Sequence, residues 1–224
     1  MTTQMALREA MFQQLALIAK AMASPKRLEL LELLIQSPKS VEDLALQSRV
    51  SVKLASAHLK ALRHARMVET ERQGKRVIYR IASAEIPSLC MQLRRLAEAR
   101  LHEMQEAVRQ FSDQQDEWQG ASHAVLLQKA RAGEIIVIDV RVTEEYAYQH
   151  IPFARSIPFT ELRAQLATLP KDIPIVAYCR GPFCMMSSTA AQILRAQGFE
   201  ASHFKAGIAE WQGGALDKGR ADES

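Results

Sequence analysis

The N-terminal part of the chain carries apolar side chains at the spacing of three and four residues that an amphipathic helix requires. This pattern predicts helices over residues 5–22, 26–36 and 51–63, and a short helix that starts at Ser40 with Asp43 in its first turn. A tight turn separates the short helix from the helix over residues 51–63. Two helices joined in this way are typical of a helix-turn-helix unit.

One side of the predicted helix 51–63 is apolar, and we expect Leu54, Leu59 and Leu62 on that side to be buried. The period then changes, because apolar positions over residues 67–82 surround a turn at Gly74 as they do in a β-hairpin. The hairpin directly follows the helical unit.

A further apolar stripe runs from Ile86 to Phe111 and predicts one long helix. A helix of this length beside so small a domain has more apolar surface than that domain covers. We therefore expect it to pair with a second copy of the chain in a homodimer.

The second half of the chain alternates short apolar runs with helical patterns. Residues 135–140 and 173–178 fit buried parallel strands, and residues 124–131 and 187–197 fit helices. This alternation predicts an α/β domain with a central parallel sheet. The preceding segment, residues 112–122, is polar and aperiodic, so we expect the domain boundary there.

The composition of the 224 residues, 48% hydrophobic and 24% charged, is that of a globular protein with room for two modest domains. No apolar run is long enough for a membrane span, and the N-terminus lacks a secretory signal pattern, so we expect a cytoplasmic protein without membrane contact. Cys90, Cys179 and Cys184 are too few for a disulfide framework. They are better interpreted as structural, metal-binding or reactive thiols.

The net charge of +4 comes entirely from the first 120 residues, and residues 24–81 hold 12 basic against 6 acidic side chains. This asymmetry favours a polyanion partner, and a helix followed by a basic hairpin fits double-stranded DNA. Lys and Arg neutralise phosphates, whereas Ser and His can reach base edges. The candidate DNA-binding residues are Ser51, Lys53, Ser56, His58, Lys60 and Arg63 on the helix and Arg72, Lys75 and Arg76 at the hairpin tip.

The run from Ala23 to Leu31 (ASPKRLELL), together with Ser51 and the run from Ser56 to Arg63 (SAHLKALR), resembles the ArsR/SmtB family of dimeric winged-helix repressors. That resemblance implies release of DNA when a metal, a metalloid or a reactive sulfur species binds. The first half has no Cys-x-Cys pair, so the metalloid ligands of some members are missing. Glu98, His102 and Glu106 share a face, but we interpret them as a solvated charged surface and predict neither a metal site nor a cofactor.

Cys90 lies on the apolar stripe of the predicted long helix, where a free cysteine usually acts as a small hydrophobic residue. The alternative is a sensing thiol that receives sulfur from the second domain. Both interpretations of Cys90 stay open from the sequence.

Cys179 stands at the end of a predicted buried strand, and a short loop separates it from a helix that begins near Ser187. Backbone N–H groups at such a helix start lower the pKa of a thiol and stabilise an anion. We therefore expect Cys179 to be a nucleophile able to carry sulfur as a persulfide. The candidate loop residues are Arg180, Gly181, Pro182, Phe183, Cys184 and Met185.

This segment resembles the rhodanese family of sulfurtransferases, in register with further positions along the second half. Those positions are Asp139, Arg141, Glu145, His150, Pro152, Ile157, Pro158, Gly207 and Trp211, of which we expect Asp139, Arg141, His150 and Trp211 to maintain the fold. The resemblance implies that Cys179 takes a sulfane sulfur from a small donor such as thiosulfate or polysulfide and passes it to a thiol or cyanide.

The loop departs from the family pattern, in which Gly and then Arg-Ser follow the cysteine. Cys184 stands where a basic residue is common, and it is either an inward-facing loop residue or a resolving thiol that attacks modified Cys179. Phosphatases and arsenate reductases of this fold use Cys-x5-Arg, but Met185 occupies the arginine position. Phosphate or arsenate chemistry is therefore poorly supported.

Together these patterns predict a winged helix-turn-helix domain over residues 1–111, a linker over 112–122 and a rhodanese-like α/β domain over 123–218. The leading hypothesis is a homodimeric repressor whose second domain acquires sulfur on Cys179. Two alternatives remain: a sulfurtransferase that uses its helical half for dimerisation, and a repressor whose second domain only binds a small anion.

Overall fold

The computed structural model describes residues 2–111, Trp118 and residues 122–211, which fall into two compact units, Met1–Cys90 and Met91–Ser224. Most of the predicted linker 112–122 lies outside the described residues, and the domain boundaries expected from the sequence stay a prediction. No helix within the described ranges combines the length and the apolar character that crossing a bilayer requires.

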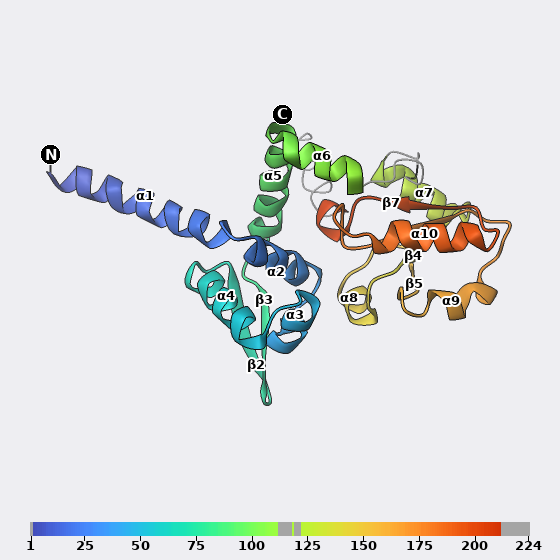
Figure 1. Cartoon of the computed structure of the whole chain (residues 1–224), viewed down its shortest axis with the longest axis horizontal. Helices are drawn as coiled ribbons and strands as arrows, with labels where there is room; N and C mark the ends of the chain where they lie inside the picture. Colours follow the sequence, from blue (N-terminus) through green and yellow to red (C-terminus); the bar gives the residue numbers. More distant parts are fainter. Residues whose placement is uncertain (1, 112–117, 119–121, 212–224) are drawn as a thin grey trace. The chain divides into compact units, whose positions relative to one another are not determined.

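The first unit combines helices with a small antiparallel sheet of order β1-β3-β2, and Figure 1 shows strands β2 and β3 as a hairpin beside α3 and α4. Its elements are α1 (Thr2–Met22), α2 (Pro25–Gln36), β1 (Lys39–Ser40), α3 (Val41–Gln47), α4 (Val52–His64), β2 (Val68–Gln73), β3 (Arg76–Ile81) and the start of α5 (Glu85–Arg100). The predicted helices and the hairpin are confirmed. Leu30, Leu31, Leu44, Leu59 and Leu62 are fully buried and form the centre of the core.

Serine caps define the two helices of the helix-turn-helix. The Ser40 side chain accepts a hydrogen bond from the Asp43 backbone N–H at the start of α3. The Ser51 side chain does the same for Leu54 at the start of α4. These caps set where each helix begins and therefore fix the length of the turn between them.

Lys26 and Arg27, two basic residues of the N-terminal motif, hold this unit together. The Arg27 guanidinium donates to the carbonyls of Lys20 and Ala21 at the end of α1. Lys26 Nζ donates to the Ser48 carbonyl at 2.8 Å and to Glu29 at 2.7 Å, so it joins α2 to the turn after α3. Both side chains satisfy helix-end carbonyls that otherwise lack partners.

Two expectations from the periodicity are wrong. The single long helix is broken at Leu101 into α5 and α6 (His102–Phe111), and Gln105 Nε2 donates to the Glu98 carbonyl beside the break at 2.9 Å. Because a side chain satisfies that carbonyl, the helix can end there without glycine or proline. Leu54 is 45% exposed rather than buried, because Ala55, Leu59 and Leu62 form the buried face of α4.

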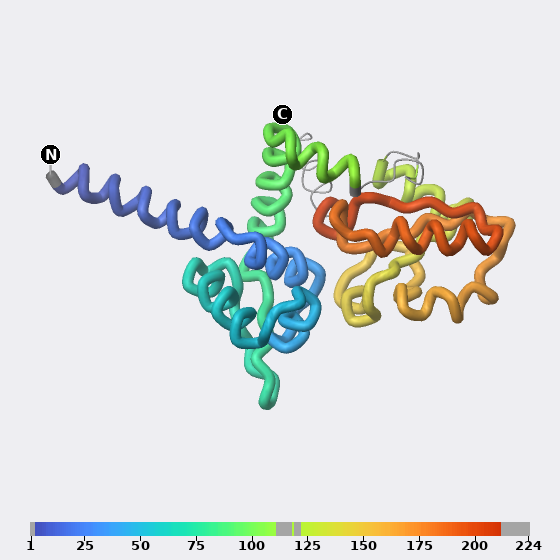
Figure 2. The backbone as a smooth tube through the Cα atoms, in the orientation of Figure 1, coloured from blue at the N-terminus to red at the C-terminus, as the bar shows by residue number. Residues whose placement is uncertain are grey.

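The second unit contains a parallel sheet of order β5-β4-β6-β7, which confirms the predicted α/β architecture; Figure 2 follows its backbone. Its elements are α7 (His123–Ala132), β4 (Ile136–Asp139), α8 (Thr143–Tyr148), β5 (Arg155–Ser156), α9 (Leu162–Gln165), the 3-10 helix η2 (Leu166–Thr168), β6 (Ile175–Tyr178), α10 (Met186–Ala196) and β7 (Ala201–Phe204).

Alternating residues of the central strands pack in two apolar layers, one on each face of the sheet. Ile138 and Ala177 pack with Leu194 of α10, whereas Val137 and Val176 pack with a layer that includes Leu126 of α7. Trp118 joins the second layer, and its backbone N–H donates to the His203 carbonyl at 2.8 Å. This residue of the predicted linker is thus docked on the second unit.

A buried polar cluster ties the ends of β4 and β6 together. Asp139 and Arg141 are both fully buried, and the guanidinium donates to the carboxylate at 2.7 to 3.1 Å. The Tyr178 hydroxyl donates to Asp139 and accepts from the Ile151 backbone N–H. Burial, and then the Asp139 charge, raise the pKa of Tyr178 far above its usual value, so Tyr178 stays a neutral donor.

We expect Asp139→Ala to lower the free energy of unfolding of the second unit by about 3–5 kcal/mol, because Arg141 is then left buried without its carboxylate. Urea denaturation followed by circular dichroism measures this loss. Glu134→Ala is the matched control, because it removes an ion pair with Lys129 whose side chains are 57% and 43% exposed; it should cost less than about 1 kcal/mol. Equal losses in the two variants would contradict the structural role assigned to Asp139.

Candidate functional site

The loop that follows β6 holds two cysteines that are bonded to each other. Cys179 is 2% exposed at the end of the strand, and a disulfide links it to Cys184, with the Cα atoms 6.3 Å apart. The loop turns back on itself because the Cys184 backbone N–H donates to the Gly181 carbonyl at 3.0 Å. Helix α10 begins two residues after Cys184, and the N–H groups of its first turn have no partner within the helix.

Arg180, the first residue of the loop, is held by a carboxylate from α8. Glu145 is fully buried, and the Arg180 guanidinium donates to both of its carboxylate oxygens at 2.8 to 3.2 Å. The two side chains form a charge-assisted pair that fixes the start of the loop. Glu145 belongs to the sequence motif of this domain, but its partner was not evident from the sequence.

Gly207 allows a second segment to approach the loop. A Cβ atom at this position would lie 2.0 Å from the Arg180 carbonyl oxygen, so only glycine fits without moving the backbone. The Gly207 backbone N–H donates to Glu210 at 2.8 Å, and the Glu210 carboxylate also lies close to Gly181. Glu210 was missed in the sequence, where a lone glutamate outside the recognised motifs gives no signal.

The predicted DNA-binding residues lie on α4 and on the β2–β3 hairpin of the first unit. Figure 1 shows the hairpin tip reaching beyond the helices of that unit. Ser51, Lys53, Lys60, Arg63, Arg72, Lys75 and Arg76 are exposed, and Ser56 and His58 are partly buried. The Ser51 hydroxyl is engaged as the cap of α4, so its oxygen already has a backbone partner.

Arg49 is an exposed basic residue that the sequence did not single out. It lies in the turn between α3 and α4, where its φ of 53° places the backbone in the left-handed region. At the base of the hairpin, by contrast, Arg80 is paired with Glu69 at 2.8 Å. The unpaired positive charge of the hairpin therefore concentrates towards its tip.

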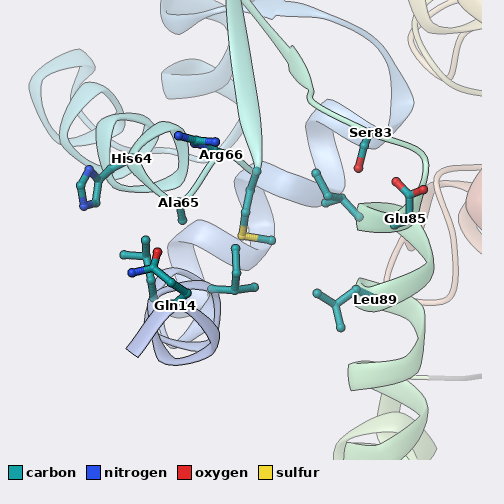
Figure 3. A pocket seen from close by; sticks show the side chains of 11 residues that line it. Gln14, His64, Ala65, Arg66, Ser83, Glu85 and Leu89 are labelled. Atoms are coloured by element: carbon teal, nitrogen blue, oxygen red, sulfur yellow. The ribbon is translucent and has the colours of Figure 1, made fainter. Parts of the chain in front are cut away.

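A groove of about 850 Å³ runs between α1, the end of α4 and the start of α5, within the first unit (Figure 3). Leu17, Ile18 and Ile86 contribute apolar lining, and Gln14 and Glu85 are among its polar residues. The apolar stripes of α1 and α5 continue from it as large exposed side chains. They are Met5, Leu7, Met11, Phe12 and Leu15 on α1 and Leu89, Leu93 and Leu96 on α5.

Cys90 is partly buried against the core of the first unit. Burial, and to a lesser degree the negative charge of Glu32, raise the pKa of its thiol to about 11. The thiol is therefore protonated at neutral pH, which favours the interpretation of Cys90 as a small hydrophobic residue.

The side chains weighed as metal ligands in the sequence pair with other groups. Glu98 lies 3.4 Å from Arg94 on the same helix, and His102 lies 3.3 Å from Glu106 across one turn of α6. Both pairs have the i, i+4 spacing of surface ion pairs.

Two protein families match separate parts of the chain. The family described as "Bacterial regulatory protein, arsR family" matches residues 24–70, and the rhodanese-like domain family matches residues 122–213. The HTH-type transcriptional regulator Rv0324 of Mycobacterium tuberculosis is 37% identical over 205 residues, which cover 92% of this chain and 90% of that protein. The chain belongs to the ArsR family of transcriptional regulators.

This ArsR-family regulator carries a rhodanese-like domain after its winged helix-turn-helix. The second domain is similar to a putative sulfurtransferase of Bacillus subtilis, YtwF, at 36% identity over 93 residues, which cover 41% of this chain and 88% of that protein. The first is similar to the homodimeric winged helix-turn-helix DNA-binding domain of Mb0332 from Mycobacterium bovis, with a TM-score of 0.41 and 34% identity. That match covers 43% of this chain and 89% of the solved one.

We expect Cys90 to react with iodoacetamide at pH 7.5 far more slowly than glutathione does, because only about one molecule in 3,000 carries the thiolate at a pKa near 11. The rate should rise about tenfold per pH unit up to pH 10, since deprotonation supplies the nucleophile. Mass spectrometry of the unreduced protein measures this reaction on Cys90 alone, because the disulfide protects Cys179 and Cys184. If Cys90 reacts as fast as glutathione at pH 7.5, Cys90 again becomes a candidate sensing thiol.

Proposed function

We propose that this ArsR-family regulator is a homodimeric repressor that binds double-stranded DNA and whose rhodanese-like domain accepts sulfur on Cys179. Acceptance of sulfur at Cys179 weakens DNA binding. The observation that carries the proposal is the place of Cys179, buried at the end of a central strand and followed by a loop and a helix, in a chain that also holds a DNA-binding module.

The exposed basic residues support DNA as the partner of the first domain. Helix α4 places Lys53, Lys60 and Arg63 along a major groove and its flanking phosphates, and Arg72 and Arg76 at the hairpin tip are also placed for phosphate contacts. Arg49, in the turn before α4, adds a charge next to the same helix. Lys26 and Arg27, by contrast, are occupied within the fold and contribute little to this surface.

The apolar surfaces of α1 and α5 support a homodimer. Met11 and Leu15 are each 66% exposed, and Leu96 is 59% exposed, although they belong to regular helical stripes. Continuous apolar surface of this kind usually marks an interaction site rather than a solvated face. A two-fold pairing through these helices would present two copies of α4 to DNA.

The loop chemistry supports sulfur rather than phosphate as the substrate of the second domain. Arg180 is bound to Glu145, and Met185 stands where an oxyanion-binding arginine would be needed. A thiolate at Cys179 can attack the outer sulfur of thiosulfate or polysulfide and keep that sulfur as a persulfide. We propose these small sulfur compounds as its donors.

We expect Lys53→Ala and Arg76→Ala each to weaken DNA binding and to reduce the slope of log affinity against log salt by about one. Each substitution removes one phosphate contact, so the loss should be similar on different DNA sequences. Fluorescence anisotropy with the DNA upstream of the protein's own coding sequence measures both quantities. Arg131→Ala, an exposed substitution on α7, is the control and should change neither. Unchanged salt slopes in the Lys53 and Arg76 variants would contradict the proposed surface.

We expect thiosulfate or polysulfide to weaken DNA binding of the reduced wild-type protein by about tenfold, a usual size for coupling between two sites. Cys179→Ser should bind DNA as tightly as wild type and should not respond, because no persulfide can form. Gel shift with the same upstream DNA measures this response. Tight binding that ignores sulfur in both proteins would show that the second domain does not control DNA binding.

A further inference from the structure

We propose that Cys184 is the group that resolves the Cys179 persulfide, and that the regulator thereby releases the accepted sulfur as hydrosulfide without an external acceptor. This inference rests on the proposed function, because it begins from the persulfide on Cys179. It adds a second thiol to the reaction and names the product.

The loop brings the two sulfur atoms together. The Cα separation of 6.3 Å lies within the range of protein disulfides, and the two sulfurs are bonded in the structure. Cys184 packs against the same apolar layer as Cys179, while its neighbours Phe183 and Met185 are 41% and 56% exposed. The side chain of Cys184 therefore turns inward, towards the end of β6.

The ends of this loop are fixed from outside it. Arg180 is held by the buried Glu145 carboxylate, and Gly207 packs so tightly against the Arg180 carbonyl that no side chain fits there. Met186 begins the regular turns of α10 on the other side. Since both ends are anchored, Cys184 needs only a small movement to reach a sulfur atom attached to Cys179.

In the first step, the Cys179 thiolate attacks the outer sulfur of thiosulfate. A bond forms between the two sulfurs, the bond inside thiosulfate breaks, and sulfite leaves with its electron pair. Cys179 now carries a persulfide.

In the second step, Cys184 attacks the inner sulfur of this persulfide, the Sγ atom of Cys179. The bond to the outer sulfur breaks, and that sulfur leaves as hydrosulfide with the electron pair and the proton of the Cys184 thiol. The two thiols are oxidised to the Cys179–Cys184 disulfide, and the sulfane sulfur is reduced to sulfide. A dithiol reductant must then reopen the disulfide before another donor can react.

This assignment explains why a cysteine occupies the loop position where a basic residue is common. A basic side chain would stabilise a bound anion, whereas Cys184 consumes the persulfide by displacement. Each reduced chain should therefore release one sulfide and then stop. The disulfide form is the product of the reaction, and it cannot accept sulfur because the Sγ atom of Cys179 is already bonded.

The experiment is a single turnover of the full-length protein. The chain is reduced with dithiothreitol, freed of reductant under argon and mixed with thiosulfate. Sulfite reports the first step and hydrosulfide reports only the second, while peptide mass spectrometry distinguishes the persulfide from the disulfide. Wild type should release one equivalent of each product and close the Cys179–Cys184 bond.

Cys184→Ser should release sulfite as wild type does, retain the persulfide on Cys179 and release hydrosulfide at least about tenfold more slowly. Cys184→Ala should behave in the same way, and circular dichroism checks that both variants are folded. Cys90→Ser is the matched control, because it removes the other thiol of the chain and should leave both products unchanged.

Two results would overturn the inference, and they can be told apart. If wild type releases sulfite, keeps a stable persulfide and forms no disulfide, Cys184 has no resolving role while sulfur acceptance by Cys179 stands. If neither wild type nor Cys184→Ser releases sulfite or gains sulfur on Cys179, the proposed sulfur acceptance from thiosulfate fails together with the inference.

Discussion

The buried carboxylate of Asp139 is the constraint on which the second domain depends. The Asp139 carboxylate accepts hydrogen bonds from Arg141 and from Tyr178, the last residue of β6. The Tyr178 hydroxyl in turn accepts a hydrogen bond from the backbone N–H of Ile151. These hydrogen bonds hold together the carboxyl ends of the neighbouring strands β4 and β6 and the segment after α8. Cys179 is the next residue along the chain, so its position follows from that charge cluster.

The first domain uses its polar residues in a comparable way. Ser40 and Ser51 set the starts of α3 and α4, and Lys26 and Arg27 close helix ends. Ser51, a candidate for DNA contact in the sequence, is thus partly committed to folding. The charge that remains exposed lies on α4, in the turn before it and at the hairpin tip, where α4 itself is held by fully buried leucines.

The sequence predicted most of the elements because periodicity and capping residues are local signals. It did not reveal the break at Leu101, since a glutamine that caps the Glu98 carbonyl leaves the apolar period intact. The sequence also did not reveal that Leu54 is exposed, because Leu54 fits the apolar spacing of α4. Both cysteines of the loop were recognised, but Glu210 depends on contacts between segments that no spacing rule encodes.

The position of Trp118 has a practical consequence. The chain has only two tryptophans, and both Trp118 and Trp211 pack into the same apolar layer of the second domain, with Trp118 edge-on to Phe204 and Trp211 edge-on to His123. Intrinsic tryptophan fluorescence therefore observes the rhodanese-like half alone. The winged helix-turn-helix carries no tryptophan, so a change in this fluorescence reports unfolding or binding events in the second domain without the addition of any label.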